Sequence, residues 1–427
     1  MIRARLGGLF LAASIVLLPI AAGCNAIFGI RDGQPEGGGG SAGGGGAGGT
    51  GAGGAVCPPV KPEECMGDAF LADGDNCCIA GRSCQGGACV DGVCQSTPHG
   101  QTAQGGESIG VVRTGDLVLW SGGWERAIYR TDVDGGGFGT LVGGAQHDLN
   151  YVTMIAADPD SDGYVFFTDY DGGRIGRASI ETGQTVVLAE VPTSVVPIAK
   201  ARWGRILVHG DHVYWSLDFQ ADDGMGGQAG KHIWRAPREP AEPLPVEAEM
   251  VVMTTGAFGI AADDDHLYFG NSDTGTVERL AFSDIGNTDG NGAPILGTPE
   301  ILAQGQGTIG DVAVDEENVY WAVENQVRYQ RKDLPGSSIS TVFGLDSWVW
   351  GIAPDGRDIY ISTVGDGSTV QGALWRAFID RSAQPERLYQ TEGDAVTSYK
   401  SVYTLAQDCD TVYFVIQQGG LVRRVTK

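Results

Sequence analysis

One pattern recurs along the chain and constrains its fold more strongly than any other feature. Each copy contains an acidic turn, an apolar strand rich in aromatic residues, a Gly-rich turn and a further strand that carries Val/Ile-x-Arg. The clearest copy runs from Asp263 to Leu280. The aromatic strand occurs seven times, at 117–120, 164–167, 212–215, 266–269, 318–321, 358–361 and 411–414. The copies are spaced by about 40 to 54 residues, a range that includes four-stranded propeller blades.

The strand that follows each aromatic strand is repeated as well. Its seven copies lie at 128–130, 175–177, 233–235, 277–279, 327–329, 374–376 and 422–424. The fifth copy departs from the others, because Tyr329 replaces the arginine. The strands are apolar on both faces, as they must be when each sheet is sandwiched between two neighbours. No window shows a helical period. The sequence therefore predicts an all-β chain that forms a seven-bladed β-propeller.

The two ends of the repeat region predict how the ring closes. The seventh copy stops at Lys427, just after its arginine strand, so a fourth strand is missing there. The segment 103–110 (AQGGESIG) matches 303–310 (AQGQGTIG), where a fourth strand leads into the next blade. We therefore expect residues ahead of the first copy to complete the last blade, which would remove an open sheet edge.

The N-terminus has the organisation of an export signal. A short basic segment precedes an apolar run (6–20) that is too short to span a membrane comfortably. The run ends in AAGC (21–24), which resembles the lipobox of bacterial lipoproteins. The resemblance implies a signal peptide at 1–23 and a diacylglycerol on Cys24. We expect an exported chain, anchored by lipid to the cell envelope at the outer membrane. Ala21 stands where Leu is commoner, which leaves ordinary secretion as the alternative.

Two segments of distinct composition separate this signal from the repeats. Residues 24–56 contain the lipidated N-terminus and a Gly-rich linker, which has few side chains to bury and is typical of a flexible tether. Residues 57–94 form a cysteine-rich module, and residues 95–427 form the propeller. The module contains seven cysteines, which are Cys57, Cys65, Cys77, Cys78, Cys84, Cys89 and Cys94.

We expect the cysteines of the module to form disulfides. A segment of this size cannot build a sufficient core without such crosslinks. Zinc is the competing interpretation, although no histidine lies between Cys57 and Cys94. Cys409 provides an eighth cysteine once Cys24 is lipidated, so an even number is available for pairing. We expect Cys57 to pair with Cys409.

The cysteine spacing and the strand motif together resemble one group of proteins. The segment 86–95 (GGACVDGVCQ) and the adjacent Cys77-Cys78 resemble the cysteine modules of myxobacterial surface lipoproteins. The strands of the Asn-Val-Tyr-Trp kind resemble the propellers of the same group and, more distantly, NHL and YWTD propellers. The resemblance implies a fold and a location. It implies no particular activity.

One acidic turn has the order of a calcium-binding loop. Its candidate ligands are Asp158, Asp160, Asp162 and Asp169, with Gly163 at the turn. The last position is normally a glutamate that chelates with both oxygens. Acidic turns also occur at the equivalent place in other copies, where an aspartate can accept hydrogen bonds from nearby backbone amides. Calcium is the one cofactor that the sequence suggests, and a plain turn is the alternative.

A second group of candidates lies in loops that share one face of a propeller. These loops enter the first strand of a blade or join its second and third strands. Their aromatic and acidic residues are candidates for a rim around the central channel: Trp203, Asp218, Asp222, Asp223, Phe258, Trp348, Trp350 and Tyr399. Such a rim would suit a sugar, a peptide or a cationic ligand. Alternatively, the aromatic residues wedge between blades.

The net charge and the motifs limit which classes of function the sequence is compatible with. The formal net charge of −25 argues against nucleic acid, whose recognition needs a basic surface. No nucleophile elbow or zinc-binding His-Glu pair occurs, so we assign no catalytic residue. The sequence favours a monomeric, surface-anchored, non-catalytic propeller that binds a protein or glycan through its loop face. The alternative is a calcium-dependent propeller hydrolase or lyase, such as a lactonase, because propellers host both classes.

Overall fold

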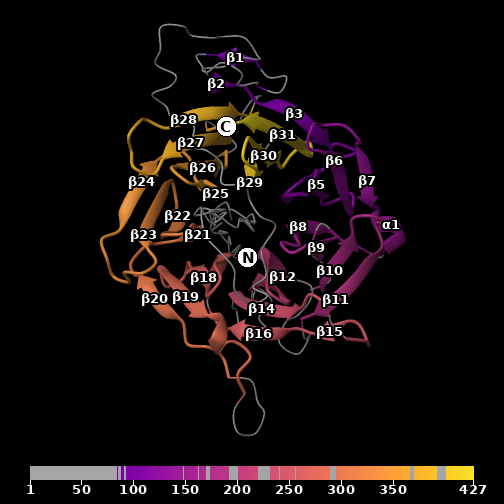
Figure 1. The fold of residues 1–427 in the computed structure, drawn as a ribbon, viewed down its shortest axis with the longest axis horizontal. Coiled ribbons are helices and arrows are strands. Elements are labelled where there is room, and N and C mark those ends of the chain that lie inside the picture. The colour runs from indigo at the N-terminus through magenta and orange to yellow at the C-terminus, as the bar shows by residue number, and fades with distance from the viewer. Residues whose placement is uncertain are drawn as a thin grey trace, which may run out of the picture.

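The computed structural model describes residues 84–427 apart from 85–87, 91–92, 148, 162, 170–173, 192–200, 220–230, 240, 255, 289–294, 366–369 and 392–400. Within these residues, seven sheets of four or five strands are arranged radially around an axis (Figure 1). Blades that are neighbours in the sequence are neighbours in the ring. The predicted all-β, seven-bladed propeller is confirmed. Among the described residues no helix has both the length and the apolar character needed to cross a membrane.

Each blade begins with its innermost strand, close to the axis, and continues outward (Figure 1). Blade 1 consists of β4 (Val111–Thr114), β5 (Leu117–Gly122), β6 (Ala127–Asp132) and β7 (Gly139–Val142), and is followed by the short helix α1 (Gly144–His147). Blade 2 consists of β8 (Val152–Ala157), β9 (Tyr164–Asp169), β10 (Arg174–Ser179) and β11 (Thr185–Glu190). Blade 3 consists of β12 (Ala201–His209), β13 (His212–Phe219), β14 (Lys231–Pro237) and β16 (Glu249–Val252), and its β15 (Val246–Glu247) pairs in parallel with β11.

The remaining blades follow the same order. Blade 4 consists of β17 (Ala257–Ala262), β18 (His266–Asn271), β19 (Thr276–Ala281) and β20 (Glu300–Ala303), with the 3-10 helix η4 (Phe282–Asp284) after β19. Blade 5 consists of β21 (Ile309–Val314), β22 (Asn318–Val323), β23 (Gln326–Arg331) and β24 (Ser340–Gly344). Blade 6 consists of β25 (Val349–Asp355), β26 (Asp358–Thr363), β27 (Ala373–Phe378) and β28 (Glu386–Gln390). Blade 7 consists of β29 (Val402–Gln407), β30 (Thr411–Ile416), β31 (Leu421–Thr426) and β3 (Thr97–Gln101).

The ring closes through an N-terminal strand, as predicted. Strand β3 pairs antiparallel with β31, so that Thr97 lies opposite Arg424. The guanidinium of Arg423 adds a hydrogen bond to the carbonyl oxygen of Ser96 at 2.7 Å. The strand lies just before the segment 103–110, whose match to 303–310 covers the loop into the next blade. Closure of the ring thus covers the edge that β31 would otherwise expose.

The sequence pattern of the aromatic strands follows from their position. Each is the second strand of a blade, and its central residues are buried on both faces, as in β22. Apolar residues on both faces are needed because each sheet packs against the sheets before and after it. The first strands approach each other so closely that some positions require glycine. A Cβ on Gly259 would lie 2.5 Å from the backbone nitrogen of Val312 in the next blade.

Arginines of the third strands join neighbouring blades. Four of them donate a hydrogen bond to the carbonyl oxygen of the residue that follows the third strand in the next blade. The pairs are Arg130 to Ile180 (3.3 Å), Arg177 to Arg238 (3.0 Å), Arg279 to Lys332 (2.8 Å) and Arg424 to Val133 (2.7 Å). The last pair joins blade 7 to blade 1. The repeated arginine thus stabilises the packing of one blade on another.

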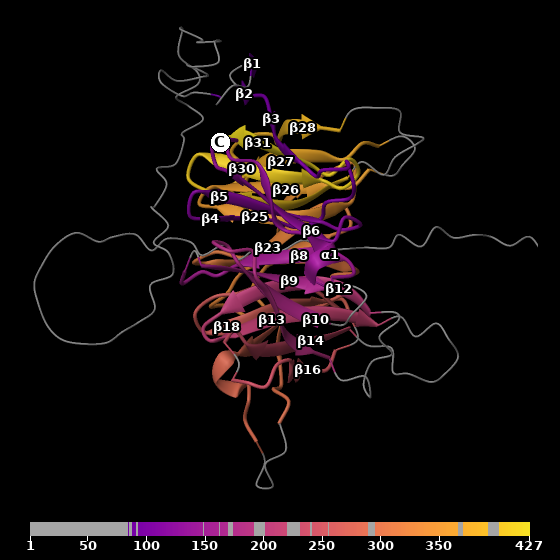
Figure 2. The ribbon, with the colours of Figure 1, turned by 90° about the vertical axis from the view of Figure 1, so that its right-hand side faces the viewer.

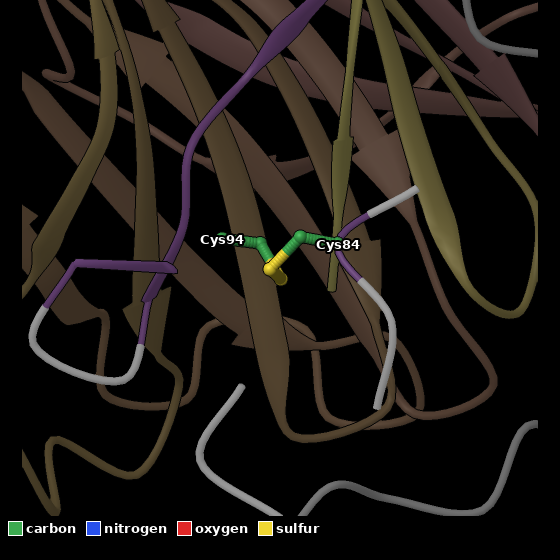
Figure 3. Close-up of a disulfide and its surroundings, with 2 residues drawn as sticks. All are labelled: Cys84 and Cys94. Carbon is green, nitrogen blue, oxygen red and sulfur yellow. A yellow bond between two sulfur atoms is a disulfide. The ribbon is translucent and has the colours of Figure 1, made fainter. Parts of the chain in front are cut away.

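The end of the cysteine-rich module packs against the propeller. Strands β1 (Cys89–Val90) and β2 (Val93–Cys94) form a small hairpin, and both views place it next to β3 (Figures 1 and 2). Figure 3 shows the disulfide between Cys84 and Cys94. These two cysteines belong to the same buried cluster as Phe414 of blade 7. Cys89 and Cys409 each take part in a further disulfide.

Several sequence-based predictions fall outside the described residues. They are the signal peptide (1–23), the lipidation site Cys24, the linker (24–56) and the cysteines Cys57, Cys65, Cys77 and Cys78. The pairing of Cys57 with Cys409 stays a prediction.

Candidate functional site

The loop face of the propeller carries a cluster of aromatic and acidic residues where the ring closes. We define the closure cluster as Glu107, Trp124, Tyr151 and Gln417. Glu107 lies in the segment between β3 and β4, Trp124 in the turn between β5 and β6, Tyr151 just before β8, and Gln417 after β30. Three neighbouring segments of the chain therefore meet the distant segment of Gln417 at the junction of blades 7, 1 and 2.

Hydrogen bonds fix most of the closure cluster. The hydroxyl of Tyr151 and the side-chain amide of Gln417 both donate to the carboxylate of Glu107, one to each oxygen. The backbone N–H of Gly123 donates to the carbonyl oxygen of Glu107 at 2.9 Å. Position 123 requires glycine, because a Cβ there would lie 2.8 Å from the ring of Tyr151. These contacts hold the tyrosine ring in one place.

Trp124 projects from this support into solvent. Its side chain is 74% exposed, and its ring meets that of Tyr151 edge to face, with 4.9 Å between the centroids. Large aromatic side chains normally bury most of their surface. A tryptophan that is exposed and packs on a fixed tyrosine ring is therefore unusual. Such an arrangement is typical of binding surfaces.

A second carboxylate lies beside Trp124. One oxygen of Glu125 accepts hydrogen bonds from the backbone N–H groups of Gln104 and Gly106, both at 3.0 Å, and the other accepts one from the hydroxyl of Tyr129. Burial acts against ionisation of Glu125, but these hydrogen bonds outweigh it and lower its pKa. Glu125 therefore remains negatively charged at neutral pH, next to an exposed aromatic ring.

The predicted rim residues do not form one continuous surface. Trp350 is only 7% exposed and packs edge to face on Tyr403 of the next blade, with 4.8 Å between the centroids. It wedges between blades, as the alternative interpretation proposed. Phe258 is half-buried in β17, and its carbonyl oxygen accepts a hydrogen bond from Ser216 of blade 3 at 2.6 Å. Trp348 is 42% exposed on the loop before β25.

The remaining rim candidates can be placed only in part. The backbone of Trp203 pairs with Leu217 between β12 and β13, and that of Asp218 pairs with Lys231 between β13 and β14. Asp222, Asp223 and Tyr399 lie outside the described residues.

Two of the candidate calcium ligands, Asp158 and Asp169, lie far apart. Asp158 and Asp169 lie at opposite ends of β9, which spans roughly 17 Å at 3.3 Å per residue. Asp169 accepts hydrogen bonds from the backbone of Asn150 and Tyr151 and binds Arg174 at 2.6 Å. Asp162 lies outside the described residues.

A basic residue of blade 3 binds the two acids of this turn that are described. Arg238 contacts Asp158 at 3.0 Å and Asp160 at 2.6 Å. The backbone N–H of Asp160 donates to Asp158 at 3.0 Å, which is the hydrogen bond expected of a plain turn. Across the described residues, no group of three His, Cys, Asp or Glu side chains is placed to hold a metal ion.

Acidic turns of other blades also bind their own backbone or a basic residue of the next blade. In blade 4, Asp263 accepts hydrogen bonds from the backbone of Asp265 and His266, from the hydroxyl of Tyr268 and from Lys332 of blade 5. Lys427 of blade 7 similarly binds Asp355 of blade 6 at 2.7 Å. The acidic turns therefore bind their own backbone and basic residues of the next blade.

A buried ion pair lies among the innermost strands. Arg205 of β12 binds Asp311 of β21, so the pair joins blades 3 and 5. Both side chains are fully buried, and Asp311 also accepts a hydrogen bond from the backbone N–H of Ile352 in blade 6 at 2.9 Å. Burial raises the pKa of Asp311 to about 6, although Arg205 acts in the opposite direction, and burial lowers the pKa of Arg205 to about 10. The pair links three blades close to the axis.

Sequence reasoning missed Trp124, Glu107 and Gln417. A tryptophan in the polar turn GGWER (122–126) is a signal that could have indicated an exposed aromatic residue. The proximity of the four residues of the closure cluster has no signal in the sequence, because the geometry of the ring brings them together.

Comparisons with known proteins agree on the fold. No protein-family model and no curated protein sequence matches the chain. A streptogramin B lyase structure is 12% identical with a TM-score of 0.56, and the match covers 78% of this chain and 97% of the other. Virginiamycin B lyase from Staphylococcus aureus is 14% identical with a TM-score of 0.53, covering 78% and 98%. The β-propeller domain of Cps50 (Swd1) from Myceliophteria thermophila is 12% identical with a TM-score of 0.50, covering 78% and 99%. At these identities the similarity shows the fold alone.

Proposed function

We propose that this chain is a surface-anchored, non-catalytic binding propeller, and that it recognises a protein or glycan ligand through its loop face. The observation that supports this function best is the closure cluster. An exposed Trp124 rests there on Tyr151, whose hydroxyl is fixed by Glu107. A preorganised aromatic residue loses little conformational freedom when a ligand binds, which favours affinity.

The described acidic residues also favour binding over the enzyme alternative. A calcium-dependent hydrolase or lyase needs several carboxylates that converge on one ion, with a base close by. Asp158, Asp160, Asp263 and Asp355 are instead bound by basic residues of neighbouring blades. These carboxylates already have a structural use.

The proposed location rests on the N-terminal sequence. In this proposal Cys24 carries the lipid, residues 24–56 act as a tether, and the propeller stands away from the outer membrane as in myxobacterial surface lipoproteins. Secretion without a lipid remains the alternative at this step. The binding function does not depend on which of the two is correct.

The proposed function can be tested by array binding. The purified exported chain would be applied to a glycan array and a peptide array, in parallel with Trp124→Ala and a matched control. Leu334→Ala is a suitable control, because Leu334 is also exposed but lies in the loop between β23 and β24. We expect at least one class of probe to bind the natural chain and the control but not Trp124→Ala.

Two outcomes would contradict the proposal. One is that no probe distinguishes Trp124→Ala from the natural chain. The other is turnover of a lactone substrate that a chelator abolishes, which would favour the enzyme alternative.

A further inference from the structure

We propose that the closure cluster binds a cationic side chain, a lysine or arginine presented by a protein ligand. This inference rests on the proposed binding function and specifies the chemistry of the partner. It starts from the exposed indole of Trp124 and from two carboxylates, that of Glu107 in the cluster and that of Glu125 beside it.

The indole of Trp124 offers a face to a cation. Tryptophan is the best of the aromatic side chains for cation–π contacts. Tyr151 meets the indole edge to face and is itself bonded to Glu107, so the position of the aromatic pair is supported from below. A ligand can therefore reach the exposed ring without displacing a described side chain.

The hydrogen bonding of the carboxylates favours a cation over a sugar. A carboxylate that already accepts several hydrogen bonds has fewer acceptor sites left for the directional hydrogen bonds of sugar hydroxyl groups. Both oxygens of Glu107 already accept hydrogen bonds, from Tyr151 and Gln417. Both oxygens of Glu125 are also used, by two backbone N–H groups and Tyr129. Their negative charge remains, however, and it attracts a cation without needing a free lone pair.

The charge of the whole molecule acts in the same direction. A formal net charge of −25 attracts basic partners and speeds their association at low ionic strength. The exposed Arg126, next to Glu125, opposes this locally. Its backbone has a φ of 55° and lies against Gly144 at the start of α1. Removal of this arginine should therefore improve the site for a cation.

The test uses the purified exported chain and three fluorescent probes. These are hexa-arginine, hexa-glutamate and an uncharged N-acetylglucosamine hexamer, and binding is followed by anisotropy at low and at about 0.15 M salt. The variants are Trp124→Ala, the matched control Leu334→Ala, which removes an exposed apolar side chain between β23 and β24, and Arg126→Asn, because Asn tolerates a positive φ.

We expect hexa-arginine to bind the natural chain, and hexa-glutamate not to bind. Trp124→Ala should weaken hexa-arginine binding about two- to fivefold, in line with loss of a cation–π contact at an exposed site. Leu334→Ala should leave it unchanged, and Arg126→Asn should strengthen it. Circular dichroism of each variant would confirm that the fold is intact.

Other results would overturn the inference. If hexa-arginine binds Trp124→Ala as it binds the natural chain, the acidic surface as a whole attracts the peptide and the closure cluster is not the site. If the sugar hexamer binds and Trp124→Ala abolishes that binding, the cluster is a glycan site, so the binding function stands and the cationic partner is wrong. If neither probe binds the natural chain, the inference also fails, while the array experiment still decides the broader function.

Discussion

At the scale of single residues, the ion pair between Arg205 and Asp311 stands out because both side chains are fully buried. Removal of one partner from a buried pair leaves the other charge without compensation, which is far more costly than removal of both. The pair joins two blades, and Asp311 also binds the backbone of a third.

Arg205→Met should therefore destabilise the chain by about 3–5 kcal/mol, because it leaves the Asp311 carboxylate buried without a counter-charge. Chemical denaturation would measure this loss. The double variant Arg205→Met/Asp311→Leu should recover most of the stability. Arg331→Met is the matched control, since Arg331 forms an exposed pair with Asp333 and its loss should leave stability unchanged. Equal effects of the two methionine variants would contradict a structural role for the buried pair.

The same carboxyl predicts a pH dependence. Its pKa is raised from 3.8 to about 6 in the folded chain, so the folded chain binds this proton more tightly than the unfolded chain. The stabilisation that protonation gives is complete below pH 3.8 and is lost as the pH rises through about 6. The difference in unfolding free energy between the natural chain and Asp311→Asn should therefore change with pH between about 4 and 6. A difference that stays constant across this window would contradict the raised pKa.

At the scale of elements, third-strand arginines hold four of the blades to the next one. Arg279 donates to the carbonyl oxygen of Lys332 and pairs with Glu300 of its own blade at 2.7 Å. Lys332 in turn binds Asp263. The repeated arginine, the acidic turn and the basic residue after the third strand therefore form one network across the junction of two blades.

Arg279→Met should lower the free energy of unfolding by about 1–3 kcal/mol, because the carbonyl oxygen of Lys332 loses a charged donor at a partly buried site. Thermal and denaturant unfolding would measure this effect. Arg331→Met serves as the control, since Arg331 is exposed and pairs only with nearby Asp333 among its described contacts. A loss no larger than that of the control would show that the arginine contributes nothing to the packing of blades.

The strands show which parts of the fold could be predicted from the sequence. The second and third strands were predictable because burial on both faces requires apolar residues, and the arginine repeats because its acceptor repeats. The closing strand was expected, but its position was not visible. Strand β3 is an outer strand that contains Pro98 and has only His99 buried, so it carries no apolar pattern. Trp350 could not be assigned to the rim or to a blade junction, because the sequence does not show which neighbour covers it.

At the scale of the whole molecule, the ends of the ring depend on each other. A chain truncated to begin at Ser108 retains all seven aromatic strands but lacks β3, so it exposes the edge of β31. We expect it to aggregate or to melt at a lower temperature. A chain that begins at Gln95 retains β3 and should fold into a closed ring, without the contribution of Cys84 and Cys94 to the buried cluster. Equal melting temperatures and a monomeric state for both truncated chains would contradict the closure.

The location of the molecule is a separate prediction. Cys24→Ser should move the chain from the membrane fraction to the soluble fraction after lysis, because stable attachment requires the acyl chains. Immunoblots of the two fractions and the mass of the N-terminal peptide would measure this. A natural chain that is already soluble and carries no acyl mass on Cys24 would favour ordinary secretion.

The position of the closing strand in the sequence also determines when the ring can close during synthesis. Ser96 and Arg423, which bond to each other in the finished ring, are separated by 327 positions in the chain. Synthesis proceeds from the N-terminus, so β3 is made early. It stays unpaired until its partner β31 has been synthesised. The ring cannot close before β31 has been synthesised, so the last blade stays incomplete until then. A chaperone that shields strand edges would therefore be needed longest by this part of the molecule.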